Sequence, residues 1–406
     1  MKFFEDGDGV TEPMGFFSSG VHCDVKGNKD GKLDLGIIYS KRICNAAGVF
    51  TTNDVKAAPV RYCQSLLAES KACFHGLVAN SGNANACTGS RGLKDTRKMA
   101  SEVARHLGLH SKEILVFSTG RIGTPLPMSR ITAGIRDATE DIQKGFDGAN
   151  AFQEAILTSD TTTKSCSAKV STSKSEICIG GVVKGAGMIQ PQMATMLAFL
   201  TTDAGVSKSF LHTILSKAVD LSFNKITIDG DMSTNDSVIF LANNSKGVEI
   251  ENESPKVIAN FTNAVERVCS CLARKCVSDG EKVTKFVKVK IVGAKHDRDA
   301  EKVARSIANS LLVKSSWFGS DPNWGRLVDA AGCAQIGVKF EKMDLRYDDV
   351  PVLENGEPIL GNRSIWKEIV SKKEFSISMD LKIGKGNFEI WTNDLSMEYV
   401  NFNKSE

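Results

Sequence analysis

Residues 184–199 read KGAGMIQPQMATMLAF, and this stretch decides how we interpret the chain. Its two glycines permit backbone conformations closed to other residues, and Pro191 fixes one dihedral angle and removes a donor. Ala194 and Thr195 follow, ahead of an apolar run. This arrangement suits a chain that cuts its own Ala194–Thr195 bond, because the freed α-amine of Thr195 could activate its own hydroxyl as a nucleophile. The alternative is an ordinary strand or turn threonine.

The composition indicates a soluble globular protein. The chain has 406 residues, of which 41% are hydrophobic and 24% charged, enough for two domains or one large multilayer unit. A net charge of +3 with scattered lysines argues against nucleic-acid binding. The sequence contains no apolar run of about 18 residues, so it predicts no membrane-spanning helix. The acidic start does not resemble a signal or transit peptide, so we expect a cytoplasmic protein, or an organellar one if a presequence is missing.

The cysteine pattern argues against a metal site. The 11 cysteines contain no C-x-x-C pair, and no histidine lies near Cys269, Cys271 and Cys276. Zinc-finger spacing is therefore absent. We expect free thiols in a reducing compartment, with neither metal nor cofactor; a catalytic cysteine is the alternative.

Strand-like and helix-like segments alternate along the chain. This order predicts an α/β fold of layered mixed sheets flanked by helices. The expected strands are 33–39, 76–80, 114–118, 178–184, 237–242, 286–292, 375–381 and 387–392. The expected helices are 93–107, 149–157, 210–222, 257–276 and 299–310.

Two small, polar loops follow predicted strands. Asn80–Gly89 carries asparagines that favour tight turns and bonds to the backbone, so we interpret it as a structural loop, with substrate contact as the alternative. In the second loop, Thr119 and the backbone N–H of Gly120 could face a developing oxyanion. The alternative for the second loop is a simple turn after a strand.

Three further segments are rich in polar side chains. Asp160–Lys164 offers hydroxyls and a cation after a helix. Asp229–Ser237 has alternating carboxylates but lacks the closing glutamate of a calcium-binding loop, which argues against calcium. Glu281 is either a partner for a substrate ammonium group or a solvated turn residue.

These motifs occur together in one order, and the chain resembles the ornithine acetyltransferase (glutamate N-acetyltransferase) family, self-cleaving enzymes of arginine biosynthesis. The resemblance covers nearly the whole chain. Its motifs are Ala47–Asn53, Lys56–Val60, Asn80–Gly89, Ser118–Gly120, Lys184–Phe199, Asp229–Ser237, Asp279–Glu281 and Asp321–Arg326.

The resemblance implies a fold and a set of site residues. The fold would be an αββα-type, N-terminal-nucleophile-like sandwich with a smaller C-terminal α/β region at about 286–406. Cleavage would give an alpha chain, 1–194, and a beta chain, 195–406, intertwined in one unit, and two copies of each would assemble. Thr195 would be the nucleophile, with Thr119 and Gly120 as the oxyanion hole. Substrate would contact Thr195 and the set Thr161, Lys184, Glu281 and Asn403.

The implied reaction is a ping-pong acetyl transfer. Thr195 would take the acetyl group from N-acetylornithine, with its own amine accepting the proton, and glutamate would then collect the acetyl group from the threonine ester. The sequence leaves open whether acetyl-CoA also serves as a donor.

Several positions depart from the family pattern. Arg121 stands where a small aliphatic residue is usual, either disturbing the site or pointing to solvent. Lys282 stands where glycine is usual, which strains the turn if the position needs a positive φ. Gln192 and Met232 replace an asparagine and a threonine, and Ser405 is out of register with the usual terminal hydroxyl residue.

Two other functions remain open on the sequence. A related self-cleaving amidase or aminopeptidase would use the same nucleophile with water as the acceptor. An inactive relative would keep the fold for binding or assembly and would stay uncleaved.

Overall fold

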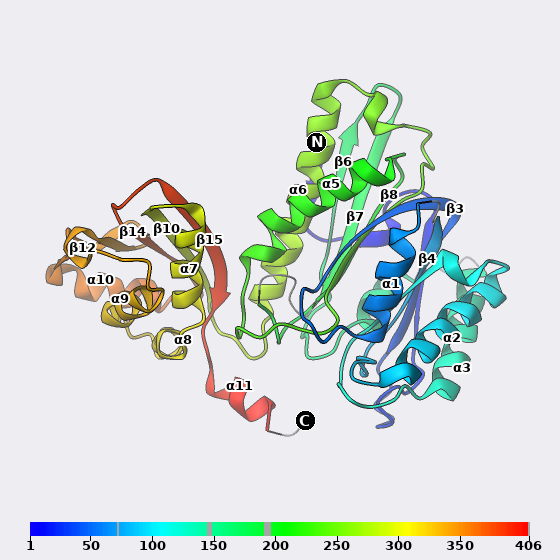
Figure 1. Cartoon of the computed structure of the whole chain (residues 1–406), viewed down its shortest axis with the longest axis horizontal. Coiled ribbons are helices and arrows are strands. Elements are labelled where there is room, and N and C mark those ends of the chain that lie inside the picture. Colours follow the sequence, from blue (N-terminus) through cyan, green and yellow to red (C-terminus); the bar gives the residue numbers. More distant parts are fainter. Residues whose placement is uncertain (71–72, 144–147, 191–195, 405–406) are drawn as a thin grey trace. The chain divides into compact units, whose positions relative to one another are not determined.

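The computed structural model describes residues 1–70, 73–143, 148–190 and 196–404. Ala194 and Thr195, the predicted cleavage site, therefore lie outside the described residues, as do Gln192 and Ser405. The chain divides into two compact units (Figure 1). The first unit comprises Met1–Ala186, Gln192–Asn224 and Met232–Cys276, and the second comprises Gly187–Pro191, Lys225–Asp231 and Val277–Glu406.

A nine-stranded mixed sheet forms the first unit's framework. The order is β1-β6-β7-β8-β9-β3-β4-β5, with β2 also paired to β3. The β4–β5 and β8–β9 pairs are parallel and the others antiparallel. The strands are β1 (Lys2–Phe4), β2 (Phe16–Val21), β3 (Leu35–Phe50), β4 (Phe74–Asn80), β5 (Ile114–Ser118), β6 (Ser165–Ser171), β7 (Glu176–Lys184), β8 (Leu197–Thr202) and β9 (Ser237–Ala242).

Strand β3 joins the two halves of this sheet. Its first part pairs with β2 and β4, and residues 45–50 pair with β9. The register against β4 shifts between Tyr39 and Cys44, a local irregularity of the kind that bends a strand. One long strand thereby places the ends of β4 and β5 in the same sheet as β8 and β9.

Helices flank this sheet. Helices α1 and α2 contact β5, α3 and α4 contact β2 and β3, and α5 contacts β3 and β9 (Figure 1). Helix α6 packs against β7. A Cβ added at Gly181 of β7 would lie 2.9 Å from the side chains of Val268 and Leu272 in α6. The helices are α1 (Ala58–Ala68), α2 (Gly89–Leu107), α3 (Met128–Gln143), α4 (Ala149–Ala155), α5 (Lys208–Leu221) and α6 (Pro255–Ser278).

The second unit is a smaller α/β structure. Its six-stranded sheet has the order β13-β12-β11-β14-β10-β15, and only the β10–β14 pair among these is parallel. Helix α7 packs on β10 and β15. The strands are β10 (Phe286–Ala294), β11 (Asp344–Tyr347), β12 (Val350–Glu354), β13 (Glu357–Pro358), β14 (Glu374–Asp380) and β15 (Gly386–Asn393). The helices are α7 (Asp297–Ala308), α8 (Leu311–Phe318), α9 (Trp324–Cys333), α10 (Arg363–Val370) and α11 (Met397–Phe402).

The predicted fold class is confirmed: both units are mixed α/β structures whose sheets are flanked by helices. All 11 cysteines are free thiols, as expected. Within the described ranges, no helix has both the length and the apolar character needed to cross a bilayer. The same ranges contain no group of three or more Cys, His, Asp or Glu side chains placed to bind a metal.

Candidate functional site

The parallel strands β4 and β5 end side by side, next to the predicted loop that contains Thr119 and Gly120. Asn80, the last residue of β4, is in register with Ser118, the last residue of β5. The Ser118 hydroxyl lies 2.7 Å from Asn80 Oδ1, and the Thr119 N–H donates to the Asn80 carbonyl at 2.9 Å. Thr119 is buried. The position of Thr119 is thus fixed by both strands rather than by a mobile turn.

Gly120 occupies a position that only glycine fits. Its φ is +130°, a conformation that other residues rarely adopt. A Cβ at this position would lie 2.3 Å from the Gly82 carbonyl carbon and 2.5 Å from the Asn83 nitrogen. Arg121, which follows, is exposed, so the charge that departs from the family pattern points to solvent.

Strand β7 ends in a buried lysine that reaches Thr119. Lys184 Nζ lies 3.4 Å from Thr119 Oγ1 and donates to Thr158 Oγ1 at 2.6 Å. It also lies 3.7 Å from Asp160 Oδ2, and the lysine side chain is only 2% exposed. The structure therefore brings together Lys184 and Thr119, which the sequence predicted as substrate-binding and oxyanion residues.

Asp160 is the carboxylate at the centre of this cluster. It accepts from Lys164 Nζ at 2.7 Å and from the Gly185 N–H at 2.6 Å, and its side chain is completely buried. Burial acts to raise the pKa of Asp160, but the ammonium groups of Lys184 and Lys164 and these hydrogen bonds hold it well below its usual range. The carboxylate is therefore ionised, and it orders both lysines.

The residues just before β9 complete the polar layer of the first unit. Asn235 Nδ2 donates to the carbonyls of Ala84 at 2.6 Å and Ser118 at 2.8 Å, which ties this segment to the ends of β4 and β5. Asp236 Oδ1 accepts the N–H of Met196 at 2.9 Å. Met196 is the first described residue after the predicted cleavage site.

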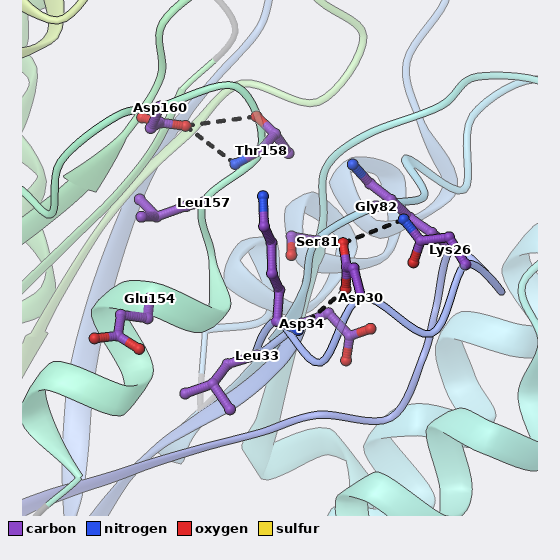
Figure 2. Close-up of a pocket in the computed structure, with 12 residues that line it drawn as sticks. Lys26, Asp30, Leu33, Asp34, Ser81, Gly82, Glu154, Leu157, Thr158 and Asp160 are labelled. Atoms are coloured by element: carbon purple, nitrogen blue, oxygen red, sulfur yellow. Dashed lines mark hydrogen bonds between the residues drawn. The ribbon is translucent and has the colours of Figure 1, made fainter.

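A cavity of about 230 Å³ adjoins this cluster (Figure 2). Its wall includes Ser81, Gly82, Thr158 and Asp160, and in Figure 2 Thr158 and Asp160 lie together, joined by dashed hydrogen bonds. Thr158 and Asp160 contact Lys184, and Gly82 packs against Gly120. The remaining wall carries charges of both signs, from Lys26, Lys32, Asp30, Asp34 and Glu154.

Two of the predicted substrate residues, Glu281 and Asn403, belong to the second unit. Asn403 Nδ2 donates to Glu281 Oε2 at 3.3 Å, so these two residues lie together. Gly187 lies against this carboxyl group, because a Cβ there would be 2.5 Å from the Glu281 carboxyl carbon. Lys282 has a φ of +55°, so the strain predicted for a non-glycine residue at this turn is present.

The remaining predictions have mixed outcomes. Thr161 is exposed, one residue beyond Asp160. The Asn80–Gly89 loop has the bonds expected of a structural loop, because Asn80 Nδ2 donates to the Asn83 carbonyl and Asn85 Nδ2 to the Gly92 carbonyl. Substrate contact by this loop stays untested.

Sequence reasoning placed Asp160, Lys164, Asn235 and Asp236 in polar segments without giving them a role in the site, and it did not name Thr158. Asp160 and Lys164 lie in irregular backbone before β6, so the four-residue spacing that indicates an ion pair on a helix gives no signal for them. Asn235 and Asp236 carry a weak signal in the sequence, since adjacent amide and carboxyl side chains directly precede an apolar strand.

Comparisons with known proteins extend over both units. The ArgJ family model matches residues 17–405. The "Arginine biosynthesis bifunctional protein ArgJ" of Thermotoga neapolitana is 42% identical over 395 residues, which cover 96% of this chain and 98% of that protein. The protein of the same name from Geobacter sulfurreducens is 42% identical over 390 residues, with the same coverage of 96% and 98%. A crystal structure of the Bacillus halodurans protein matches at 35% identity with a TM-score of 0.48, covering 51% of this chain and 98% of that one.

Proposed function

Because the chain belongs to the ArgJ family, we propose that it is a glutamate N-acetyltransferase of arginine biosynthesis. It moves the acetyl group of N2-acetyl-L-ornithine to L-glutamate. The observation that carries the proposal is the buried contact of Lys184 with Thr119, beside a glycine at which any side chain would press against the Gly82–Asn83 backbone. We further propose that the active protein assembles from two alpha and two beta chains.

Thr195 is the nucleophile in this mechanism. After self-cleavage its α-amine takes the hydroxyl proton while Oγ attacks the acetyl carbonyl. The C–N bond of N-acetylornithine breaks, the amine returns the proton to the leaving nitrogen, and an acetyl-threonine ester remains. The amino group of glutamate then attacks this ester, and the proton it loses returns through the same amine to Oγ.

The described residues support distinct parts of this chemistry. Thr119 and the Gly120 N–H stabilise the oxyanion, and the ammonium of Lys184 supplies positive charge next to them. The adjoining cavity has side chains of both signs, which suits substrates that carry both an ammonium and a carboxylate group. Glu281 and Asn403 bind the amino-acid part of the substrate. Acetyl-CoA is an alternative acetyl donor in this proposal, and no cofactor is needed.

The test uses the purified full-length chain. Denaturing gels and mass spectrometry should give two fragments, 1–194 and 195–406, and incubation with N-acetylornithine and glutamate should give N-acetylglutamate. Thr195→Ala should stay in one piece, melt as a folded protein and form no product. Acetate release without N-acetylglutamate would instead indicate a hydrolase. A folded wild-type protein that remains uncleaved would overturn the mechanism. A parallel reaction with acetyl-CoA in place of N-acetylornithine decides whether that donor is used.

A further inference from the structure

Two cysteines outside the candidate site meet between β6 and α6. Cys166 is buried in β6, and Cys271 is partly exposed on α6. The Cys166 sulfur lies 3.5 Å from the carbonyl oxygen of Val268, about one helical turn before Cys271. Both cysteines belong to the first unit, and neither has a role in the mechanism above. An accessible cysteine beside a second thiol is the usual arrangement of redox-sensitive sites.

The pairing of β6 with β7 turns Cys166 toward α6. Cys166 is in register with Gly181 of β7, and directly opposed residues of an antiparallel pair have their side chains on the same face of the sheet. A Cβ at Gly181 would point at α6, 2.9 Å from the side chains of Val268 and Leu272. The face of β6 and β7 that carries the Cys166 thiol therefore packs directly on this helix.

Helical spacing places Cys271 on the face of α6 that makes this contact. Val268, Cys271 and Lys275 stand at positions i, i+3 and i+7, which share one side of a helix. Lys275 Nζ donates to the carbonyl of Ser165, the residue next to Cys166, at 2.9 Å. The contacts made by Val268 and Lys275 lie on either side of Cys271, so the Cys271 thiol faces Cys166.

The groups around the pair favour a thiolate at Cys271. A hydrogen bond from the Cys166 thiol and the ammonium of Lys275 lower the pKa of the Cys271 thiol. Partial burial and the carboxylates of Glu5 and Asp6 act on it in the opposite direction. The same hydrogen bond, together with burial, raises the pKa of the Cys166 thiol. Cys271 is thus the more reactive nucleophile, and Cys166 is its protonated partner.

We propose that Cys271 and Cys166 form a reversible disulfide when the protein reacts with a hydroperoxide. The Cys271 thiolate attacks one peroxide oxygen, the O–O bond breaks, and the other oxygen takes a proton and leaves as water or an alcohol. The sulfur of Cys166 then attacks the Cys271 sulfenic acid. The S–S bond forms, the S–O bond breaks, and the hydroxide leaves as water with the Cys166 proton. Both sulfurs are oxidised and the peroxide is reduced.

This disulfide would join the two chains that self-cleavage produces. Cys166 precedes the predicted cut before Thr195, and Cys271 follows it. Only this consequence rests on the proposed function, because the uncleaved chain contains the same thiol pair. The bond would also fix β6 two residues beyond Lys164, whose ammonium donates to Asp160 in the candidate site.

The test exposes the reduced, full-length protein to equimolar hydrogen peroxide and then blocks the remaining thiols with N-ethylmaleimide. Peptide mass spectrometry should recover a Cys166–Cys271 cross-link that a thiol reductant removes. On a non-reducing gel the two chains of cleaved protein should migrate as one band, whereas the peptide measurement serves for uncleaved protein as well. Cys87 and Cys333, which are more exposed, should stay reduced at this dose.

Three variants separate the roles of the cysteines. Cys271→Ser should form no cross-link, and Cys166→Ser should hold Cys271 as a sulfenic acid that dimedone labels. Cys269→Ala is the matched control, because Cys269 is fully buried on the same helix but two residues from Cys271, a spacing that puts it on a different face. This control should form the cross-link at a rate within about twofold of wild type.

Absence of the cross-linked peptide from folded, oxidised wild type would overturn the proposal. A cross-link of Cys166 to another cysteine in Cys271→Ser, or loss of the cross-link in Cys269→Ala, would overturn it as well. Earlier oxidation of Cys87 or Cys333 would reject it, because exposure alone would then govern reactivity. If Cys166→Ser does not fold, Cys166→Ala takes its place with the same expected labelling. A cross-linked wild type that forms no N-acetylglutamate would refute the proposed function and support this inference.

Discussion

The two units place buried carboxyl groups at strand ends in different ways. Asp394 directly follows β15, and both of its oxygens are used, by the Thr284 N–H and hydroxyl and the Lys285 N–H. Asp236 directly precedes β9 and accepts the N–H of Met196, the first described residue after the predicted cleavage site. The same chemical group therefore closes a structural turn in the second unit and anchors the segment after the predicted cleavage site in the first.

The buried lysines repeat this contrast. Lys314 donates to the Thr392 hydroxyl and to both oxygens of Asn393, so its contacts bind helix α8 to the end of β15. Lys184 instead points at the hydroxyls of Thr119 and Thr158 beside a cavity. Burial alone therefore does not mark a functional group; contact with strand-end loops that border a cavity does.

Asp160→Asn should have the largest effect if the first unit's cluster is as we describe. The variant leaves the buried ammonium groups of Lys164 and Lys184 without their carboxylate. Losing one partner of a buried ion pair costs about 3–5 kcal/mol of unfolding free energy. Urea unfolding checks the stability, and N-acetylglutamate formation per folded molecule should also fall. If this variant were as stable as the wild-type protein, the carboxylate would not be holding the two lysines in place.

Gly120→Ala should mainly affect turnover. The added Cβ would clash with the Gly82 and Asn83 backbone and push the Gly120 N–H away from its position. Loss of one oxyanion donor costs about 100- to 1,000-fold in kcat. The measurement is kcat on protein shown to be folded by its melting curve, with Gly332→Ala as the control, because no atom lies within 4 Å of a Cβ there. A change of less than threefold would remove Gly120 from the oxyanion hole.

Lys314→Met should lower stability and remove part of its pH dependence, while leaving turnover nearly unchanged. Burial lowers the pKa of Lys314 from 10.5 to about 7, against the opposing charges of Asp394 and Asp229. Between these two values the unfolded chain holds a proton that the folded chain lacks, so wild-type stability rises with pH by up to about 1.4 kcal/mol per unit. The variant should lose that slope in urea unfolding at pH 7, 8 and 9, with turnover per folded molecule within about threefold. Equal slopes in both proteins would show that a group other than Lys314 causes the pH dependence of stability.

Much of the local structure could be predicted from the sequence. The expected strands 114–118 and 237–242 match β5 and β9 residue for residue, because short apolar runs between polar turns have little choice of structure. Strand β6 was not predicted, although Cys166, Ala168 and Val170 alternate with polar residues along it, because Cys and Ala are small and three of the polar residues are serines. Helix α3 was also missed, although Ile131, Ile135, Ala138 and Ile142 follow helical spacing and are buried on one face.

The candidate site was predictable in part. Thr119 and Gly120 were identified through a loop that follows a strand and Lys184 through the resemblance to the family, and the structure places Lys184 against Thr119. Asp160 and Asp236 were not identified as site residues, because a carboxylate in a polar loop has the same appearance in sequence whether it is solvated or buried. The Thr195 prediction stays a prediction, since that residue lies outside the described ranges.

The alternation of strands and helices and the family of the chain follow from the amino-acid sequence alone, because they depend on local backbone preferences and on motifs in a fixed order. The tertiary structure was needed to show that residues 80, 118, 160, 184 and 235 share one buried polar layer. The physical reason is that β3 bends between two sets of strands, and the sheet order β9-β3-β4-β5 brings together strand ends that are far apart in the chain.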